Sequence, residues 1–225
     1  MNSQNTKAWF GLLVLAAIMA LLLFLAAGTV RYWEAWIYLA VFLGASWLIT
    51  LYLMRNDPAL LRRRLKGGPM AEQEPVQKLI MFLASLGFIA SLIVPALDYR
   101  FHWSSVPLYA IVAGDVLVAA SFWIIFLVYR ENTYTSATIE ISEGQKVVST
   151  GPYALVRHPM YAGGALLFVG TPLALGSYWG ILAFLVLLPA LIWRLLDEER
   201  FLAKNLPGYV DYCGRVRWRL IPAIF

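Results

Sequence analysis

The chain has 225 residues, of which 61% are hydrophobic and 14% charged, and its formal net charge is +5. This composition is too apolar for a water-soluble domain of that length. The positive charge indicates membrane topology and attraction to anionic headgroups rather than nucleic-acid binding, because no nucleic-acid-binding motif accompanies it. The single cysteine, Cys213, excludes an internal disulfide and a metal site built on paired cysteines, and we expect no metal.

Four runs with one charge or none are each long enough for the about 20 residues that a helix needs to cross hydrocarbon. In chain order they cover residues 8–30, 35–54, 79–97 and 103–129. The first is longer than the ~7–15 apolar residues of a signal peptide, so we expect a retained span. Asp115 is the one charge inside the fourth run, where it predicts either a structural hydrogen bond to a neighbouring helix or a functional group.

A fifth uncharged run, residues 159–193, would be roughly 52 Å long as one straight helix. Glycine and proline interrupt it near the middle, which predicts a tight helical hairpin with arms of ~16 residues. Such arms are short for a full crossing, so a shallow or tilted hairpin also remains open. The predicted fold class is an all-α integral membrane protein of about six transmembrane helices, the last two forming the hairpin.

Short loops rich in Lys and Arg stay in the cytoplasm, so residues 55–78, with four basic side chains at 62–66, are predicted to be cytoplasmic. Six alternating crossings then place both termini and residues 130–158 on the same side. The latter segment contains a β-branched stretch and a turn, which predicts a short hairpin or an ordered loop. We divide the chain into an accessory helix pair, 1–54, and a core, 55–225.

Polar side chains crowd two tracts, residues 151–163 and 197–215, on either side of the predicted hairpin. If the hairpin turns on the far side of the membrane, both tracts return to the cytoplasmic surface. His158 and Glu198 then lie close together although they are 40 positions apart in the sequence. This arrangement predicts a pocket at headgroup level, formed by residues 130–158 and the C-terminal tail.

The order of motifs in residues 131–225 resembles the isoprenylcysteine carboxyl methyltransferase and phospholipid methyltransferase superfamily. The motifs are Gly151-Pro152-Tyr153, Arg157-His158-Pro159-x-Tyr161-x-Gly163, Glu198-Glu199-x-x-Leu202, Pro207-Gly208-Tyr209-x-x-Tyr212, Arg215-Val216 and Leu220-Ile221-Pro222. The resemblance implies an S-adenosylmethionine (SAM)-dependent enzyme of a bacterial or archaeal cytoplasmic membrane, which releases S-adenosylhomocysteine. Its partners would be membrane lipids and a lipophilic or small hydrophobic methyl acceptor, and the oligomeric state stays open.

SAM carries a sulfonium, an amino-carboxylate, a ribose and an adenine, which suit carboxylate or aromatic faces, cations and an apolar slot. The resemblance and these residue types predict the cofactor-binding residues Tyr153, Arg157, His158, Tyr161, Gly163, Glu198 and Glu199. The predicted catalytic residues are His158, Glu198 and Arg215, and the predicted acceptor-binding residues are Arg215, Trp193 and Tyr212.

Several of these residues have a structural alternative. His158 before a proline is typical of a helix start. Consecutive glutamates on a helix diverge by about 100°, so we expect only one of the pair to face the pocket, and we favour Glu198. Tyr209 is predicted to be an interfacial anchor, and Arg215 either holds an acceptor carboxylate or phosphate or pairs with anionic lipid.

Three acceptor groups fit this prediction: a prenylcysteine-like carboxylate, an amine headgroup and a thiol. Only the last two must lose a proton and need a general base such as His158 or a glutamate. A membrane reductase of the sterol-reductase type, with NADPH in place of SAM, is an alternative function. A non-catalytic transporter or assembly factor is another, although a transport path would place polar groups along several spans.

Overall fold

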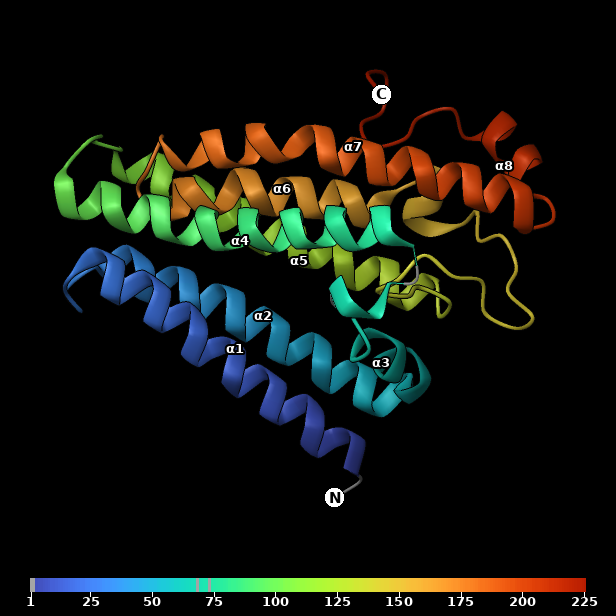
Figure 1. The fold of residues 1–225 in the computed structure, drawn as a ribbon, viewed down its shortest axis with the longest axis horizontal. Coiled ribbons are helices and arrows are strands. Elements are labelled where there is room, and N and C mark those ends of the chain that lie inside the picture. The colour runs from blue at the N-terminus through green and yellow to red at the C-terminus, as the bar shows by residue number, and fades with distance from the viewer. Residues whose placement is uncertain (1–2, 68, 73) are drawn as a thin grey trace.

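The computed structural model describes residues 3–67, 69–72 and 74–225, and these residues form helices and no strand (Figure 1). The predicted all-α fold is confirmed. The α-helices are α1 (Ser3–Ala27), α2 (Trp33–Asn56), α3 (Pro58–Arg64), α4 (Pro75–Phe101), α5 (Leu108–Glu131), α6 (Pro159–Ala174), α7 (Gly180–Asn205) and α8 (Tyr209–Arg215). Two 3-10 turns, η1 (Pro69–Ala71) and η2 (Gly151–Ala154), precede α4 and α6.

Five helices, α1, α2, α4, α5 and α7, are long and apolar enough to cross a membrane, which supports an integral membrane protein. The apolar helix α6 has only 16 residues, whereas α7 has 26 because it continues into the charged stretch after Trp193. The two arms of the predicted hairpin therefore differ in length. The count of six spans stays a prediction.

The two ends of the bundle differ in chemistry. In Figure 1 the links that follow α1, α4 and α6 lie at one end. The start of α1, the helix α3, residues 132–150 and α8 lie at the other, which we call the polar end. The predicted alternation of the chain agrees with this arrangement, and the cytoplasmic location of the polar end stays a prediction.

Proline and glycine set the helix boundaries at the polar end. Pro75 and Pro159 occupy the first positions of α4 and α6, where the missing N–H would have no helical partner. The predicted helix start at His158-Pro159 is therefore confirmed, and a functional role of His158 stays a prediction. Gly208 has a φ of +81°, a left-handed conformation that glycine adopts readily, and it turns the chain from α7 into α8.

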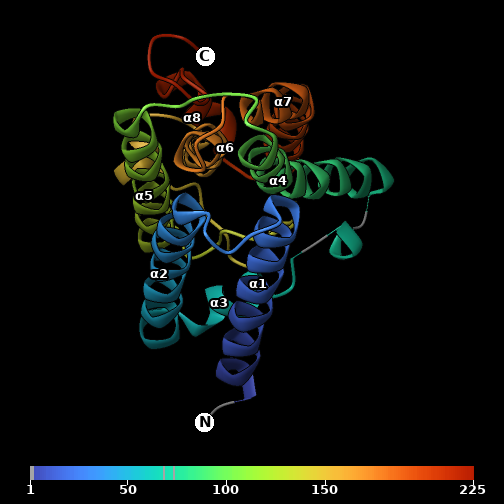
Figure 2. The ribbon, with the colours of Figure 1, turned by 90° about the vertical axis from the view of Figure 1, so that its left-hand side faces the viewer.

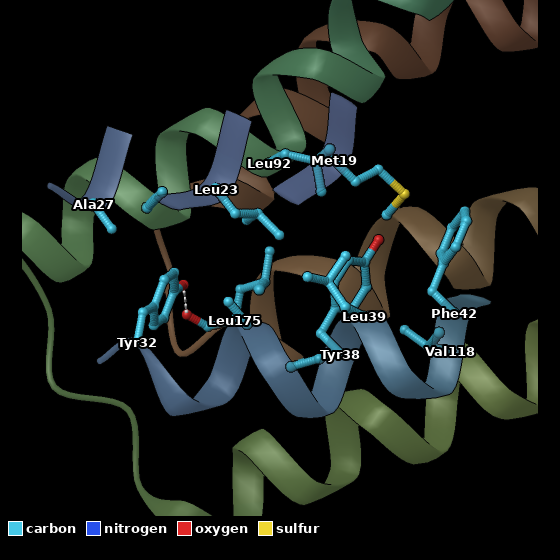
Figure 3. Packing of buried hydrophobic residues seen from close by; sticks show 13 residues of the cluster. Met19, Leu23, Ala27, Tyr32, Tyr38, Leu39, Phe42, Leu92, Val118 and Leu175 are labelled. Carbon is cyan, nitrogen blue, oxygen red and sulfur yellow. Dashed lines mark hydrogen bonds between the residues drawn. The ribbon is translucent and has the colours of Figure 1, made fainter. Parts of the chain in front are cut away.

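The helices α1 and α2 lie against the layer of α4 to α7 (Figure 2). The largest apolar cluster contains Met19, Leu23, Tyr38, Phe42, Leu92, Val118 and Leu175 (Figure 3). Within it, the Tyr32 hydroxyl donates a hydrogen bond of 2.5 Å to the Leu175 carbonyl. These contacts join residues 1–54 to residues 55–225, and their separation into an accessory pair and a core stays a prediction.

Glycine allows α5 and α6 to approach closely. A Cβ atom on Gly114 would lie 2.1 Å from the backbone nitrogen of Ala174. Asp115 follows Gly114 and points about 100° away from it around the helix. Its buried Oδ1 has no hydrogen-bond partner in the described part of the chain. The predicted structural hydrogen bond to a neighbouring helix is therefore wrong for this oxygen.

Residues 132–150 form an ordered loop, one of the two predicted forms, across the polar end. Two basic side chains of α3 donate hydrogen bonds to this loop. The Arg63 guanidinium donates to the Thr133 carbonyl, and Arg64 donates to the Ser136 carbonyl at 2.8 Å. The basic cluster that predicted membrane topology therefore also holds this loop in place.

Candidate functional site

A cavity of about 300 Å³ lies at the polar end, between the 132–150 loop, η2, the start of α6, α7 and α8. Its wall includes six of the predicted site residues: Tyr153, Arg157, His158, Tyr161, Glu198 and Tyr212. The two polar tracts of the sequence therefore meet in one enclosure. The apolar part of the wall includes Met81, Ala84, Leu191, Leu202 and Leu206.

The short link between η2 and α6 carries Arg157 and His158 into this wall. Its conformation is fixed by the C-terminal tail, because the backbone N–H of Arg157 donates to the Trp218 carbonyl at 2.8 Å. The backbone N–H of His158 donates to the Arg219 carbonyl at 2.9 Å. Only 5% of His158 is exposed, so this residue is a buried part of the cavity wall.

The two consecutive glutamates of α7 face different surroundings. Glu198 lines the cavity and accepts a hydrogen bond of 2.6 Å from the Tyr161 hydroxyl. Glu199 points away from it: its Oε1 lies 3.2 Å from the Arg157 guanidinium and 3.2 Å from His158 Nε2, and its Oε2 accepts from Arg219 at 2.9 Å. The divergence of neighbouring helical residues separates the pair as the sequence predicts.

Tyr153, Tyr209 and Tyr212 also line the cavity. The Tyr153 hydroxyl accepts from Asn132 at 3.1 Å, and the Tyr212 hydroxyl donates to the Tyr153 carbonyl at 2.8 Å. Burial raises the pKa of Tyr153 and of Tyr212, so both phenols stay neutral at physiological pH. Tyr209 is only 4% exposed, and its buried hydroxyl has no partner among the described residues. Its predicted role as an interfacial anchor is wrong, because this face of α8 turns inward.

Sequence reasoning missed the most extensive buried polar network of the site. Arg194 lines the cavity and donates to Glu72 at 2.6 Å and to Gln77 at 2.8 Å. Gln77 in turn donates to Asp197, and Glu72 accepts from the backbone N–H of Ile139 at 3.4 Å. The available signal was an arginine directly after a long uncharged run, a position where an ionisable group needs a partner.

Four predicted residues lie outside the cavity wall: Gly163, Trp193, Glu199 and Arg215. The close approach at Gly163 is to α5, since its carbonyl accepts from Ser121 at 2.7 Å and an added Cβ would meet Ile125 at 3.2 Å. Trp193 is 49% exposed on the outer face of α7, and Arg215 is exposed on α8. The binding roles of all four stay predictions.

Comparison with known proteins gives this geometry a context. Residues 109–207 match the phospholipid methyltransferase family. Protein-S-isoprenylcysteine O-methyltransferase B of Arabidopsis thaliana is 30% identical over 145 residues, which are 61% of this chain and 70% of that protein. The chain belongs to the isoprenylcysteine and phospholipid methyltransferase superfamily. A Delta(14)-sterol reductase of Mus musculus is 31% identical over 93 residues, 39% of this chain but only 22% of the reductase.

Membership of this superfamily supports a membrane methyltransferase, and the matched residues overlap the cavity. They run from α5 to the residues after α7 and include the 132–150 loop, η2 and α6. The helix α8 and the tail lie beyond the match, although Tyr209 and Tyr212 complete the cavity wall. The cavity wall is therefore built by residues within 109–207, which match the phospholipid methyltransferase family, and by residues beyond that range.

Proposed function

We propose that this protein transfers a methyl group from SAM to a lipid-like or small hydrophobic acceptor at the membrane surface. The observation that carries the proposal is the cavity at the polar end, whose wall combines carboxylate, imidazole, guanidinium and phenol groups with apolar side chains. Its volume of about 300 Å³ is at the lower end of the ~300–1,000 Å³ typical of small-molecule sites.

The donors and acceptors of the cavity suit such a cofactor. The Tyr209 hydroxyl and the Arg157 Nε are buried and have no hydrogen-bond partner among the described residues, although both residues line the cavity. Buried polar groups without partners are uncommon in folded proteins and fit a site that a ligand completes. Glu198 would bind an ammonium or hydroxyl groups, and Arg157 and His158 would face a carboxylate.

The residues of the chain would act mainly by positioning. When bound, SAM supplies an electrophilic methyl group, and its transfer is an in-line displacement that needs no covalent intermediate with the protein. The Tyr161 hydroxyl would hold the Glu198 carboxylate toward the cofactor. Hydrogen bonds to Arg64 and Glu72 hold the 132–150 loop in place, and the loop would exclude water from the reacting groups.

The apolar part of the wall suggests how a lipophilic acceptor reaches the site. Met81 and Ala84 belong to α4 and Leu191 belongs to α7, both of which are long and apolar enough to cross a membrane. An acceptor with an apolar tail would therefore enter along these helices. A carboxylate acceptor would react without a base, whereas an amine or thiol would transfer a proton to Glu198 or His158.

Binding of S-adenosylhomocysteine tests the proposal. We expect Glu198→Ala and His158→Ala each to weaken this binding by roughly 1–3 kcal/mol, since the first removes a carboxylate and the second a hydrogen-bonding imidazole from the cavity wall. Glu143→Ala is the matched control, because this glutamate is exposed on the 132–150 loop and lies outside the cavity wall. Calorimetry on the detergent-purified protein measures all three variants, and wild-type affinity in both site variants would remove these residues from the cofactor site.

NADPH titrated into the same protein tests the second candidate function. The match to the sterol reductase motivates it. A phosphorylated dinucleotide is larger than SAM, and the cavity of about 300 Å³ is at the lower end of the ~300–1,000 Å³ typical of small-molecule sites. We expect S-adenosylhomocysteine to bind and NADPH not to bind. The opposite result would favour the reductase.

Arg215→Lys separates acceptor binding from cofactor binding. If Arg215 fixes an acceptor carboxylate or phosphate through its planar fork, lysine keeps the charge but loses the paired hydrogen bonds. We expect turnover to fall at least roughly tenfold while S-adenosylhomocysteine affinity stays unchanged. Full turnover in this variant would instead assign Arg215 to contact with anionic lipid, the alternative that its exposure allows.

A further inference from the structure

We infer that the C-terminal tail, residues 216–225, is a latch that positions Arg157 and His158 in the cavity wall, with Arg219 as the positioning residue acting through Glu199. The effect on cofactor binding rests on the proposed function. The effect on the conformation of His158 does not.

The first part of the latch is backbone pairing. The carbonyls of Trp218 and Arg219 accept from consecutive backbone N–H groups, those of Arg157 and His158, at 2.8 and 2.9 Å. These two N–H groups lie directly before α6, so neither has a partner within that helix. The tail thus supplies the hydrogen bonds that fix the link carrying both side chains into the wall.

The second part is a shared carboxylate. The Glu199 side chain is 12% exposed. Its Oε1 forms an ion pair with Arg157 and a hydrogen bond with His158 Nε2, both at 3.2 Å, and its Oε2 accepts a hydrogen bond of 2.9 Å from Arg219 Nε. A carboxylate with partners on both oxygens has one preferred orientation, because rotation would break the contacts of Oε1 as well as the charged hydrogen bond from Arg219 to Oε2. Without Arg219, Glu199 would be free to turn, and its contact with His158 would loosen.

The tail holds Arg219 in place through its own contacts. The backbone N–H groups of Arg219 and Leu220 both donate to the Phe225 carbonyl at 2.8 Å. The Arg219 guanidinium also lies 5.2 Å from the centre of the Phe225 ring, within cation–π range. This closed turn presents the guanidinium to Glu199 as an ordered group.

The latch lies behind the cavity wall. Glu199 and Arg219 line a second hollow of about 430 Å³ between α7, α8 and the tail, whereas Arg157 and His158 line the main cavity. A change at Arg219 would therefore act on the main cavity indirectly, through Glu199 and the link. This separation makes the inference testable, because Arg219 itself has no place in the cavity.

Histidine NMR on the full chain in detergent tests the positioning directly. The chain has two histidines, and His102 has a φ of 55°, which asparagine tolerates. In a His102→Asn background, the ring signals belong to His158 alone. We expect Arg219→Ala to shift the Nε2 signal without any cofactor present, and Arg219→Lys to restore it in part. Arg217→Ala is the matched control, because the exposed Arg217 side chain forms no ion pair among the described residues.

Calorimetry on the same variants supplies the second measurement. We expect Arg219→Ala to weaken S-adenosylhomocysteine binding roughly tenfold and Arg217→Ala to leave it unchanged. An unchanged His158 signal in Arg219→Ala overturns the latch, and a shifted signal with unchanged affinity overturns its role at the cofactor site. If the wild-type protein binds no S-adenosylhomocysteine, the proposed function fails while the NMR result still decides the latch. Should Arg219→Ala not fold, Glu199→Gln must shift the same signal, and a wild-type signal there overturns the latch.

Discussion

Arg194→Ala is expected to lower the free energy of unfolding by about 3–5 kcal/mol, the usual effect of removing one partner of a buried ion pair. The Arg194 side chain is 9% exposed and the Glu72 side chain 2% exposed, at a separation of 2.6 Å. Alanine would leave the Glu72 carboxylate buried without its cation, and Gln77 would lose a charged donor. Chemical unfolding of the detergent-solubilised protein, followed by tryptophan fluorescence, measures the loss.

The double variant Glu72→Leu with Arg194→Met is the control for this prediction. Replacing both partners by apolar residues of similar size removes the uncompensated charge, so we expect most of the stability to return. The cavity wall would still change, because Arg194 lines it. A loss of less than about 1 kcal/mol in Arg194→Ala, typical of a surface pair, would contradict the buried role of this arginine.

Gly114→Ala should destabilise the packing of α5 against α6 by about 3 kcal/mol, at the upper end of typical overpacking effects. The new Cβ would lie 2.1 Å from the backbone nitrogen of Ala174 and 2.6 Å from the carbonyl carbon of Leu173. Backbone atoms cannot move aside as a flexible side chain can, so the two helices must separate. The thermal midpoint of unfolding in detergent measures the effect.

Gly164→Ala provides the matched comparison within α6. A Cβ at Gly164 would meet no heavy atom within 4 Å, apart from the local helix backbone. Because alanine favours a helix by up to ~1 kcal/mol over glycine, we expect an equal or slightly higher midpoint. Equal midpoints in Gly114→Ala and Gly164→Ala would mean that α5 and α6 are less closely packed than this structure has them.

The sequence by itself determined the helical architecture, because the bilayer leaves few choices to an apolar chain. Long uncharged runs must satisfy their backbone hydrogen bonds internally, so they form helices wherever they occur. Glycine and proline in the middle of residues 159–193 divided that run into α6 and α7. The ordered motifs also indicated the superfamily and the two tracts that form the cavity.

Only the tertiary structure decided which face each polar residue presents. Glu198 and Glu199 are chemically identical in the sequence, and their surroundings differ only because α7 packs between the cavity and the tail. Gly163 meets α5 rather than the cavity, and Tyr209 turns inward instead of toward the membrane surface. These outcomes depend on the rotation of each helix against its neighbours, which the pattern of one helix does not specify.

The partners of Arg194 show the same limit across a longer distance. Glu72 lies outside the helices and Arg194 lies 122 residues later, so no local spacing connects them. The latch between the tail and the link before α6 is likewise formed by residues about sixty positions apart. Hydrophobic periodicity and short motifs act within one or two helical turns. Contacts between distant segments form only when the helices pack, and those contacts complete the site.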